Sequence, residues 1–191
     1  MASALIKAIR TVSGNQPEIR RIIEEATQAF LEGTPVQVNG TDGGVQAWDG
    51  TTYTSGIAGV AKEPGSSLST TGTRKFLTFG SVPNEASAVN IPRGAPYNDG
   101  KVGFEVANND SVFYGQIGSS QTSSYAAQLV GGSYGLTKDS DNHWYVDLTK
   151  TLTSGGGSSS QAVLKIVKLD PIDTTRGVHF VFLPVSQQLL A

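Results

Sequence analysis

The sequence predicts a mainly β fold, with a small β-barrel or sandwich in the C-terminal half. Residues 112–183 contain a closely spaced series of short segments rich in β-branched and aromatic residues, with turn-forming residues between them. The most apolar segment of the chain, residues 178–183, ends this series. No interval within the series is long enough for a helix of ordinary length. Short strands at this spacing are typical of small barrels and sandwiches.

Polar or glycine-rich turns separate the strands that we expect in the C-terminal half. These strands are residues 112–117, 125–130, 133–138, 143–148, 162–169 and 178–183. Residues 139–142 form a polar turn, and Asp170 with Pro171 ends the fifth strand. Lysine alternates with apolar residues in the second half of that strand, which predicts one buried face and one solvated face.

Residues 1–33 predict one amphipathic helix. Pro17 and Glu18 suit its first turn, and Gly33 suits the position after its last turn. Apolar residues recur between them at helical spacing, namely Ile19, Ile22, Ile23, Ala26 and Phe30. We expect a surface helix with this apolar stripe toward the core.

The segment before this helix, residues 1–14, is either a second short helix or an extended arm. Leu5, Ile6 and Ile9 fall on one face if it is helical. One interpretation is a helix packed on its own sheet. The other is an arm that reaches a neighbouring subunit, with Leu5, Ile6 and Ile9 as anchors.

Residues 34–100 predict a glycine-rich β-hairpin region with one long loop. Expected strands are residues 35–38, 57–61, 74–79 and, after the loop, 101–106. Asp49-Gly50 is a preferred pair for a tight hairpin turn. The loop over residues 80–100 is unusually long for a compact domain, which favours a functional role. We therefore predict that Pro92, Arg93 and Tyr97 contact a partner. The chain thus divides into residues 1–33, 34–100 and a C-terminal barrel domain, 101–191.

Composition excludes several function classes. Charged residues are 16% of the chain, against about 25% in ordinary proteins. The formal charge is −2 and no basic cluster is denser than Arg20-Arg21 or Arg74-Lys75, so we expect no nucleic-acid partner. The absence of cysteine excludes disulfides and thiolate metal sites and suits a reducing cytoplasm. No apolar stretch approaches the ~18 residues of a membrane span, so we expect no membrane partner.

One motif has the pattern of a catalytic site. Residues 131–135 match G-x-S-x-G around Ser133, and Asp170 or Asp173 and then His179 follow in the order of a Ser-Asp-His triad. A nucleophile elbow requires a strand, a sharp turn and a helix, whereas residues after Ser133 lead into another strand. We therefore expect no enzyme.

A second motif, residues 139–143, resembles the start of a calcium loop. It has Trp144 where such a loop needs glycine. We predict no metal ion and no cofactor.

Residues 112–116, 133–137, 144–147, 165–170 and 178–182 look like the β-barrel part of tailed-bacteriophage head decoration (cement) proteins. Residues 36–68 are similar to other small phage structural proteins, and the resemblance covers about residues 34–185. It implies a β-rich structural protein, often a homotrimer, that binds the outside of an assembled capsid and reinforces contacts between capsid subunits. The expected partners are then the major capsid protein and the chain itself. The expected location is the capsid exterior of a virion assembled in the host cytoplasm.

Two alternatives remain open from the sequence. The chain could be a receptor-binding or carbohydrate-binding fibre-type module of a phage particle, with Trp48, Tyr53 and Tyr97 as an aromatic platform. It could also be an esterase built on Ser133.

Overall fold

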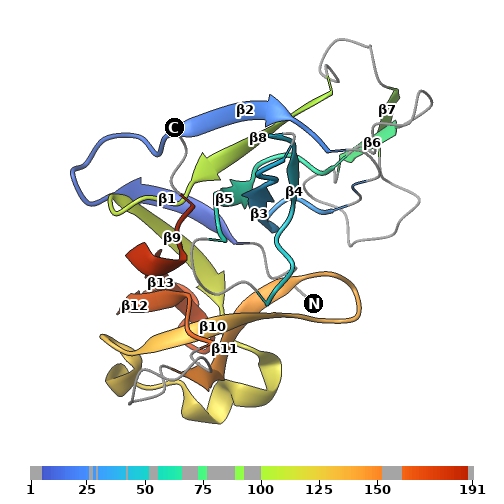
Figure 1. Cartoon of the computed structure of the whole chain (residues 1–191). Helices are drawn as coiled ribbons and strands as arrows, with labels where there is room; N and C mark the ends of the chain where they lie inside the picture. The colour runs from blue at the N-terminus through green and yellow to red at the C-terminus, as the bar shows by residue number, and fades with distance from the viewer. Residues whose placement is uncertain are drawn as a thin grey trace.

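The computed structural model contains two antiparallel β-sheets and a separate two-stranded ribbon (Figure 1). It describes residues 6–25, 28, 30–41, 43–51, 56–65, 73–76, 89–92, 100–151 and 161–188. The prediction of a mainly β fold is therefore confirmed.

The larger sheet has six strands and contains most of the C-terminal half. In spatial order they are β1 (Lys7–Thr11), β9 (Ser111–Gln116), β13 (Gly177–Phe182), β12 (Leu164–Leu169), β10 (Ser133–Lys138) and β11 (Trp144–Thr151). Three short 3-10 helices accompany them, η2 (Ser119–Ser124), η3 (Ala127–Leu129) and η4 (Pro184–Ser186). The prediction of a strand at residues 125–130 is wrong, because residues 127–129 form η3. Tyr125 is instead held by hydrogen bonds from its hydroxyl to the carbonyl oxygens of Asp173 and Gly177.

The smaller sheet has five strands. Their order is β2 (Ile19–Ile23), β8 (Lys101–Val106), β5 (Gly59–Ala61), β3 (Pro35–Val38) and β4 (Val45–Ala47). The ribbon, β6 (Thr73–Phe76) with β7 (Val89–Pro92), is inserted between β5 and β8, which are themselves neighbours in the sheet. Figure 1 shows the ribbon projecting from one side of the molecule.

Each sheet curls until its last strand meets an earlier strand again. In the six-stranded sheet a parallel bridge joins Ile117, just after β9, to Val146 of β11. In the five-stranded sheet a parallel bridge joins Glu24, just after β2, to Val45 of β4. Each contact is an isolated bridge and not a ladder, so neither sheet is a closed barrel in the described residues.

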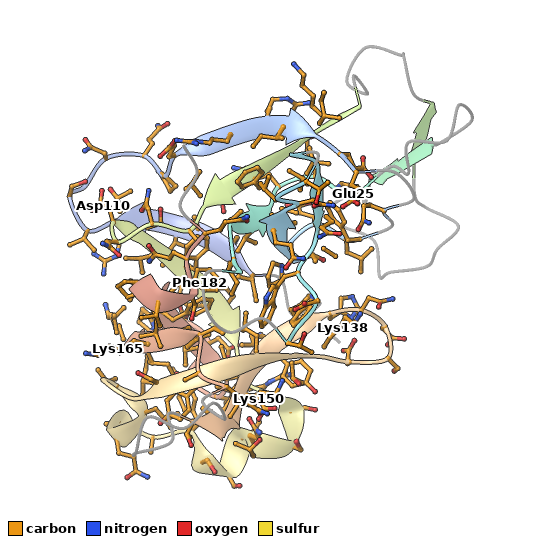
Figure 2. All side chains as sticks on the ribbon, in the orientation of Figure 1. Glu25, Asp110, Lys138, Lys150, Lys165 and Phe182 are labelled. Atoms are coloured by element: carbon orange, nitrogen blue, oxygen red, sulfur yellow. The ribbon has the colours of Figure 1, made fainter. Side chains whose placement is uncertain are left out.

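Two apolar clusters fill the concave sides of the sheets. One is formed mainly by the six-stranded sheet and includes Phe113, Phe180 and Phe182, whose rings pack edge to face or stacked with centroids 5.0–6.0 Å apart. Figure 2 labels Phe182 in this cluster. Ile57 and Val60, from the region of the smaller sheet, also belong to this cluster. The other cluster surrounds Phe30, Val36 and Phe104. Because the first cluster takes residues from both sheets, the two sheets form a continuous body.

The predicted N-terminal helix is wrong. Residues 7–11 and 19–23 form β1 and β2. Three of the five residues of β2 are isoleucine, whose β-branched side chains favour extended backbone over helix. Pairing with β9 and β8 supplies hydrogen bonds that outweigh a short helical period. For residues 1–14 the extended alternative therefore holds from Lys7 to Thr11.

Residues 108–110 form a turn, but the strands on either side of it do not pair with each other as a hairpin. The Asn108 side chain accepts hydrogen bonds from the backbone N–H groups of Asp110 and Ser111. β8 before the turn lies in the five-stranded sheet, and β9 after it lies in the six-stranded sheet. The connection from β1 to β2 makes the same transition beside it, with Val12 donating to the Asp110 carbonyl at 2.7 Å. Asp110 marks this corner in Figure 2. The predicted divisions at residues 33/34 and 100/101 therefore do not coincide with the sheets.

Candidate interaction surface

The N-terminal segment supplies an outer strand to each sheet and carries exposed apolar residues. The exposed large apolar residues in the described part of the chain are Ile9, Val12, Ile19, Ile23, Val130, Val167, Ile172 and Val185. The first four fall within fifteen consecutive residues, on β1, on β2 and on the connection between them. Exposed apolar residues gathered on one segment are a common feature of protein contact sites.

The outer rim of β1 is closed by the protein itself. The register of β1 against β9 shifts between Ala8 and Arg10, which is a β-bulge with Ile9 as the extra residue. The N–H of Ala8 donates to Oε2 of Glu105, a residue of β8 that is only 5% exposed. Oε1 of Glu105 lies 3.1 Å from the Lys62 amine. Bulges and inward-facing charges prevent another strand from pairing with an edge, so β1 is not open to strand addition.

Glu32 lies in the electrostatic field of this cluster. Burial raises the pKa of the Glu32 carboxyl above its ordinary value of 4.5, and the nearby Glu105 and Glu63 carboxylates act in the same direction. The Lys62 amine opposes this change and is the largest lowering influence. The rim of β1 therefore has several charged groups close to the ion pair between Lys62 and Glu105.

The outer rim of β2 has a different arrangement. β2 pairs with β8 on one side, with Ile19 opposite Glu105 and Ile23 opposite Lys101. Ile19 is 53% exposed and Ile23 is 58% exposed. Arg21, between them, pairs with the Glu63 carboxylate and lies opposite Gly103 of β8. β2 forms the upper rim of the molecule in Figure 1.

The predicted partner contacts are only partly brought together. Ile6 is 1% exposed and packs in the main apolar cluster, so its prediction as an exposed anchor is wrong. Its position just before β1 turns its side chain inward, while Ile9 in the bulge is 37% exposed. Pro92 ends β7. Leu5, Arg93 and Tyr97 lie outside the described residues.

Trp48 cannot belong to the aromatic platform that the fibre-type alternative requires. Trp48 is 2% exposed, and its ring packs against that of Trp144 with centroids 5.3 Å apart. A side chain buried in this way cannot stack on a sugar at the surface. Tyr53 and Tyr97, the other two predicted members, lie outside the described residues.

The G-x-S-x-G motif has a structural explanation at two of its glycines. Ser133 is the first residue of β10, which continues as a strand and pairs with β11, as expected from the sequence. A Cβ at Gly132 would lie 2.5 Å from the Tyr134 hydroxyl, and one at Gly135 would lie 2.6 Å from the Gln161 carbonyl oxygen. Both positions therefore require glycine for packing, and Ser133 lies in a strand and not at a nucleophile elbow.

The acid and base of the hypothetical triad do meet, but away from Ser133. Nε2 of His179 lies 2.8 Å from Oδ2 of Asp170, and both side chains are largely buried. Ser133 pairs with Lys165 of β12, whereas His179 pairs with Lys168, about 10 Å further along the strand. Burial raises the pKa of Asp170, but hydrogen bonds from the Asp173 backbone, from His179 and from the Ile172 backbone outweigh it and lower the pKa overall. The pair therefore fastens the turn between β12 and β13.

The region resembling a calcium loop is a side-chain-capped turn. Oδ1 of Asp139 accepts hydrogen bonds from the backbone N–H groups of Asp141 and His143. Asn142 has a positive φ of 64°. Nowhere in the described ranges do three or more His, Asp or Glu residues gather closely enough to hold a metal ion. None of the described helical segments has the length and hydropathy of a membrane span.

The sequence did not predict which residues meet at the rim of β2. Arg21 and Gly103 are far apart in the chain, and only the pairing of β2 with β8 brings them together. The density of isoleucine in residues 19–23 was the available signal for a strand. Comparisons of this chain with protein-family models, with curated proteins and with solved structures found no match.

Proposed function

We propose that this chain is a structural protein of a tailed-phage virion, which binds the outer surface of the assembled capsid as a homotrimer and stabilises contacts between capsid subunits. In this proposal it acts by binding and not by catalysis. The major capsid protein is its partner, and its C-terminal sheet is the barrel-like body of a decoration protein.

The observation that carries the proposal is the exposed apolar pair formed by Ile9 and Val12 on a weakly charged β body. Ile9 is 37% exposed in the β1 bulge, and Val12 is 67% exposed just after β1. The strand that presents them is anchored in the main sheet and, through Ile6, in the core. A rigid support lowers the conformational entropy lost on binding. Charged residues are only 16% of the chain, which limits the charge that a contact has to desolvate.

A trimer adds avidity to such a modest contact. Once one subunit is bound, the second and third contacts form at high effective concentration. Each subunit can therefore bind weakly while the trimer stays attached. This fits a contact that offers two exposed apolar side chains, Ile9 and Val12.

The proposal is tested by co-sedimentation with capsids that lack this protein. Changing both Ile9→Asp and Val12→Asp should weaken binding about tenfold or more, because two apolar contacts are lost and two charges must be desolvated. The matched control changes Ile172→Asp and Val185→Asp, at positions that are 91% and 61% exposed elsewhere on the surface. Point variants are needed, because truncation before residue 14 would remove β1 and Ile6 from the folded body.

Equal binding by the two double variants and the unchanged chain would contradict the proposal. Light scattering on the purified chain tests the trimer. The fibre-type alternative would instead appear as binding to carbohydrate arrays, and nothing in the described residues now favours it over capsid attachment.

A further inference from the structure

Basic side chains frame the outer, convex face of the six-stranded sheet. Lys7 and Arg10 belong to β1, and Lys165 and Lys168 belong to β12. All four residues are exposed. β1 and β12 lie near opposite ends of the chain, so only the strand order brings these residues onto one surface.

The strand register arranges these residues in two rows across the sheet. In the first row, Lys7 of β1 pairs with Tyr114 of β9. Tyr114 pairs in turn with His179 of β13, and His179 pairs with Lys168 of β12. Paired residues lie on the same face of a sheet, so this row runs from one lysine to the other. Phe180, the next residue after His179, is buried in the main apolar cluster on the opposite face.

The second row lies beside the first. Arg10 pairs with Val112 of β9, and Lys165 pairs with Val181 of β13. Val112 and Val181 are each two residues from the aromatic side chains of the first row, so they share its face. Three strand spacings separate β1 from β12, and the basic residues therefore mark the corners of a rectangle of about 14 Å by 7 Å.

The basic groups on this face have no acidic partner in the part of the chain that the structure describes. No carboxylate there lies within ion-pair distance of any of the four. The Lys7 amine lies over the Tyr114 ring, 5.9 Å from its centroid. Glu32 is near enough for the Lys7 charge to lower its pKa, against the larger effect of burial, but the two do not form an ion pair. The positive charges of the face are therefore available to a partner.

Two acids at one end of the face already have partners within the protein. Asp170 accepts hydrogen bonds from the backbone N–H groups of Ile172 and Asp173, and its Oδ2 lies 2.8 Å from Nε2 of His179. Asp173 accepts a hydrogen bond from the Gln116 side chain at 2.8 Å. Even when both carboxylates are counted against the four basic residues, the face keeps an excess of two positive charges. The whole chain, by contrast, has a formal charge of −2.

We propose that the outer face of the six-stranded sheet binds an acidic surface of a protein partner. Carboxylates of the partner pair with the basic residues at both ends of the rectangle, and the partner covers the partly buried Tyr114, His179 and Val181 between them. A centre of aromatic and apolar residues with a polar rim is typical of protein–protein contacts. Binding to a phosphate polymer would need a denser excess of lysine and arginine.

Under the proposed function, this partner is the capsid surface. Arg10 lies between Ile9 and Val12 in the chain, so the basic face adjoins the exposed apolar pair. This placement rests on the proposed function, and it implies that the capsid subunit offers carboxylates beside an apolar patch. The preference for an acidic polypeptide does not rest on it, because that preference is tested on the purified chain.

Binding of poly-L-glutamate to the purified chain tests this preference. Fluorescence anisotropy of the labelled polymer at low ionic strength gives the dissociation constant, because surface charges are screened less there. Changing both Lys165→Glu and Lys168→Glu should weaken binding about tenfold or more, because two attractive contacts become repulsive. The matched control, Arg20→Glu with Lys138→Glu, changes the net charge equally and should weaken binding less than about threefold. Figure 2 shows Lys138 and Lys165 on opposite sides of the molecule.

A neutral variant and a second measurement make the test independent of misfolding. Lys165→Gln with Lys168→Gln should give a smaller loss than the two glutamates, because attraction is removed without adding repulsion. Circular dichroism checks the fold of each variant. In amide NMR spectra of the unchanged chain, poly-L-glutamate should shift signals from β12 and β13 and leave those of the turn at residues 139–142 in place.

Equal losses in the Lys165/Lys168 variant and in the control would overturn the inference, as would NMR shifts confined to other surfaces. Tighter binding to single-stranded DNA of the same charge, or to vesicles containing phosphatidylserine, would also overturn it, because the preferred partner would then not be a protein. Such failures leave the contact through Ile9 and Val12 untouched. Conversely, capsid attachment could fail in co-sedimentation while poly-L-glutamate still binds this face.

Discussion

β1 and β2 are consecutive in the chain and each forms the outermost strand of its sheet, yet their free rims differ. At β1 a bulge distorts the rim, and the buried Glu105 carboxylate accepts the outward N–H of Ala8. At β2 the strand is regular, and Ile19 and Ile23 remain more than half exposed. An exposed edge strand favours aggregation unless it is protected. The rim of β2 is protected in another way, because the bridge from Glu24 to Val45 places β4 against its C-terminal end.

The largest expected effect on stability comes from a substitution at Glu105, which closes the outer edge of β1. Glu105→Ala removes the acceptor of the Ala8 N–H and the partner of Lys62, so the free energy of unfolding should fall by about 2 kcal/mol. Urea denaturation measures this change. Glu105→Gln is the matched control, because its amide oxygen still accepts from Ala8 and the loss should be smaller. Equal losses in the two variants would mean that the charge, and not the hydrogen bond to β1, stabilises the rim.

The contrast between the rims also explains what could be predicted from the sequence. Most strands of residues 101–183 were predicted correctly. The alternation of apolar and polar residues and the turn residues are local signals, and the strands form where these signals indicate them. Residues 19–23 were assigned to a helix, because Pro17, Glu18 and Gly33 are good helix signals and the isoleucines also fit a helical stripe. Pairing with β8, more than 75 residues away, decided the outcome. Local pattern contains no information about that pairing.

The candidate site was less predictable than the fold, for the same reason. Of the three predicted anchors, Ile9 is exposed in the structure, while Ile6, three residues earlier, belongs to the core. One residue of register in a strand exchanges its two faces, so exposure depends on the bulge at Ile9. The closure of β1 depends on Glu105 and Lys62, and the geometry of β2 depends on Gly103. None of these can be assigned to a rim before the strand order is known.

A smaller effect concerns the pH dependence of the closed rim. The pKa of Glu32 is raised above 4.5 in the folded protein, so the folded state holds its proton more tightly than the unfolded chain. Stability contributed by this group is complete below about pH 4.5 and is lost as the pH rises through the folded pKa. Glu32→Gln should therefore raise the free energy of unfolding at pH 7, by less than about 1 kcal/mol because the group is partly solvated.

The same Glu32 comparison at acid pH supplies its control. At pH 4 the carboxyl is mostly protonated in both states, so the gain from Glu32→Gln should disappear. Urea unfolding of the unchanged chain and of the variant at pH 4 and pH 7 gives the four free energies of unfolding that the comparison needs. A gain of the same size at pH 4 would show that the carboxylate charge is not responsible.

The smallest expected effect on stability concerns the ion pair beside β2. Glu63→Gln releases Arg21 from the ion pair over Gly103, and because the pair is partly exposed the free energy of unfolding should change by less than about 1 kcal/mol. Urea denaturation measures this change. Glu18→Gln is the matched control, since it releases Arg20, which lies on the other face of β2. Equal losses in the two variants would show that the position of the Arg21–Glu63 pair over Gly103 adds nothing to its contribution.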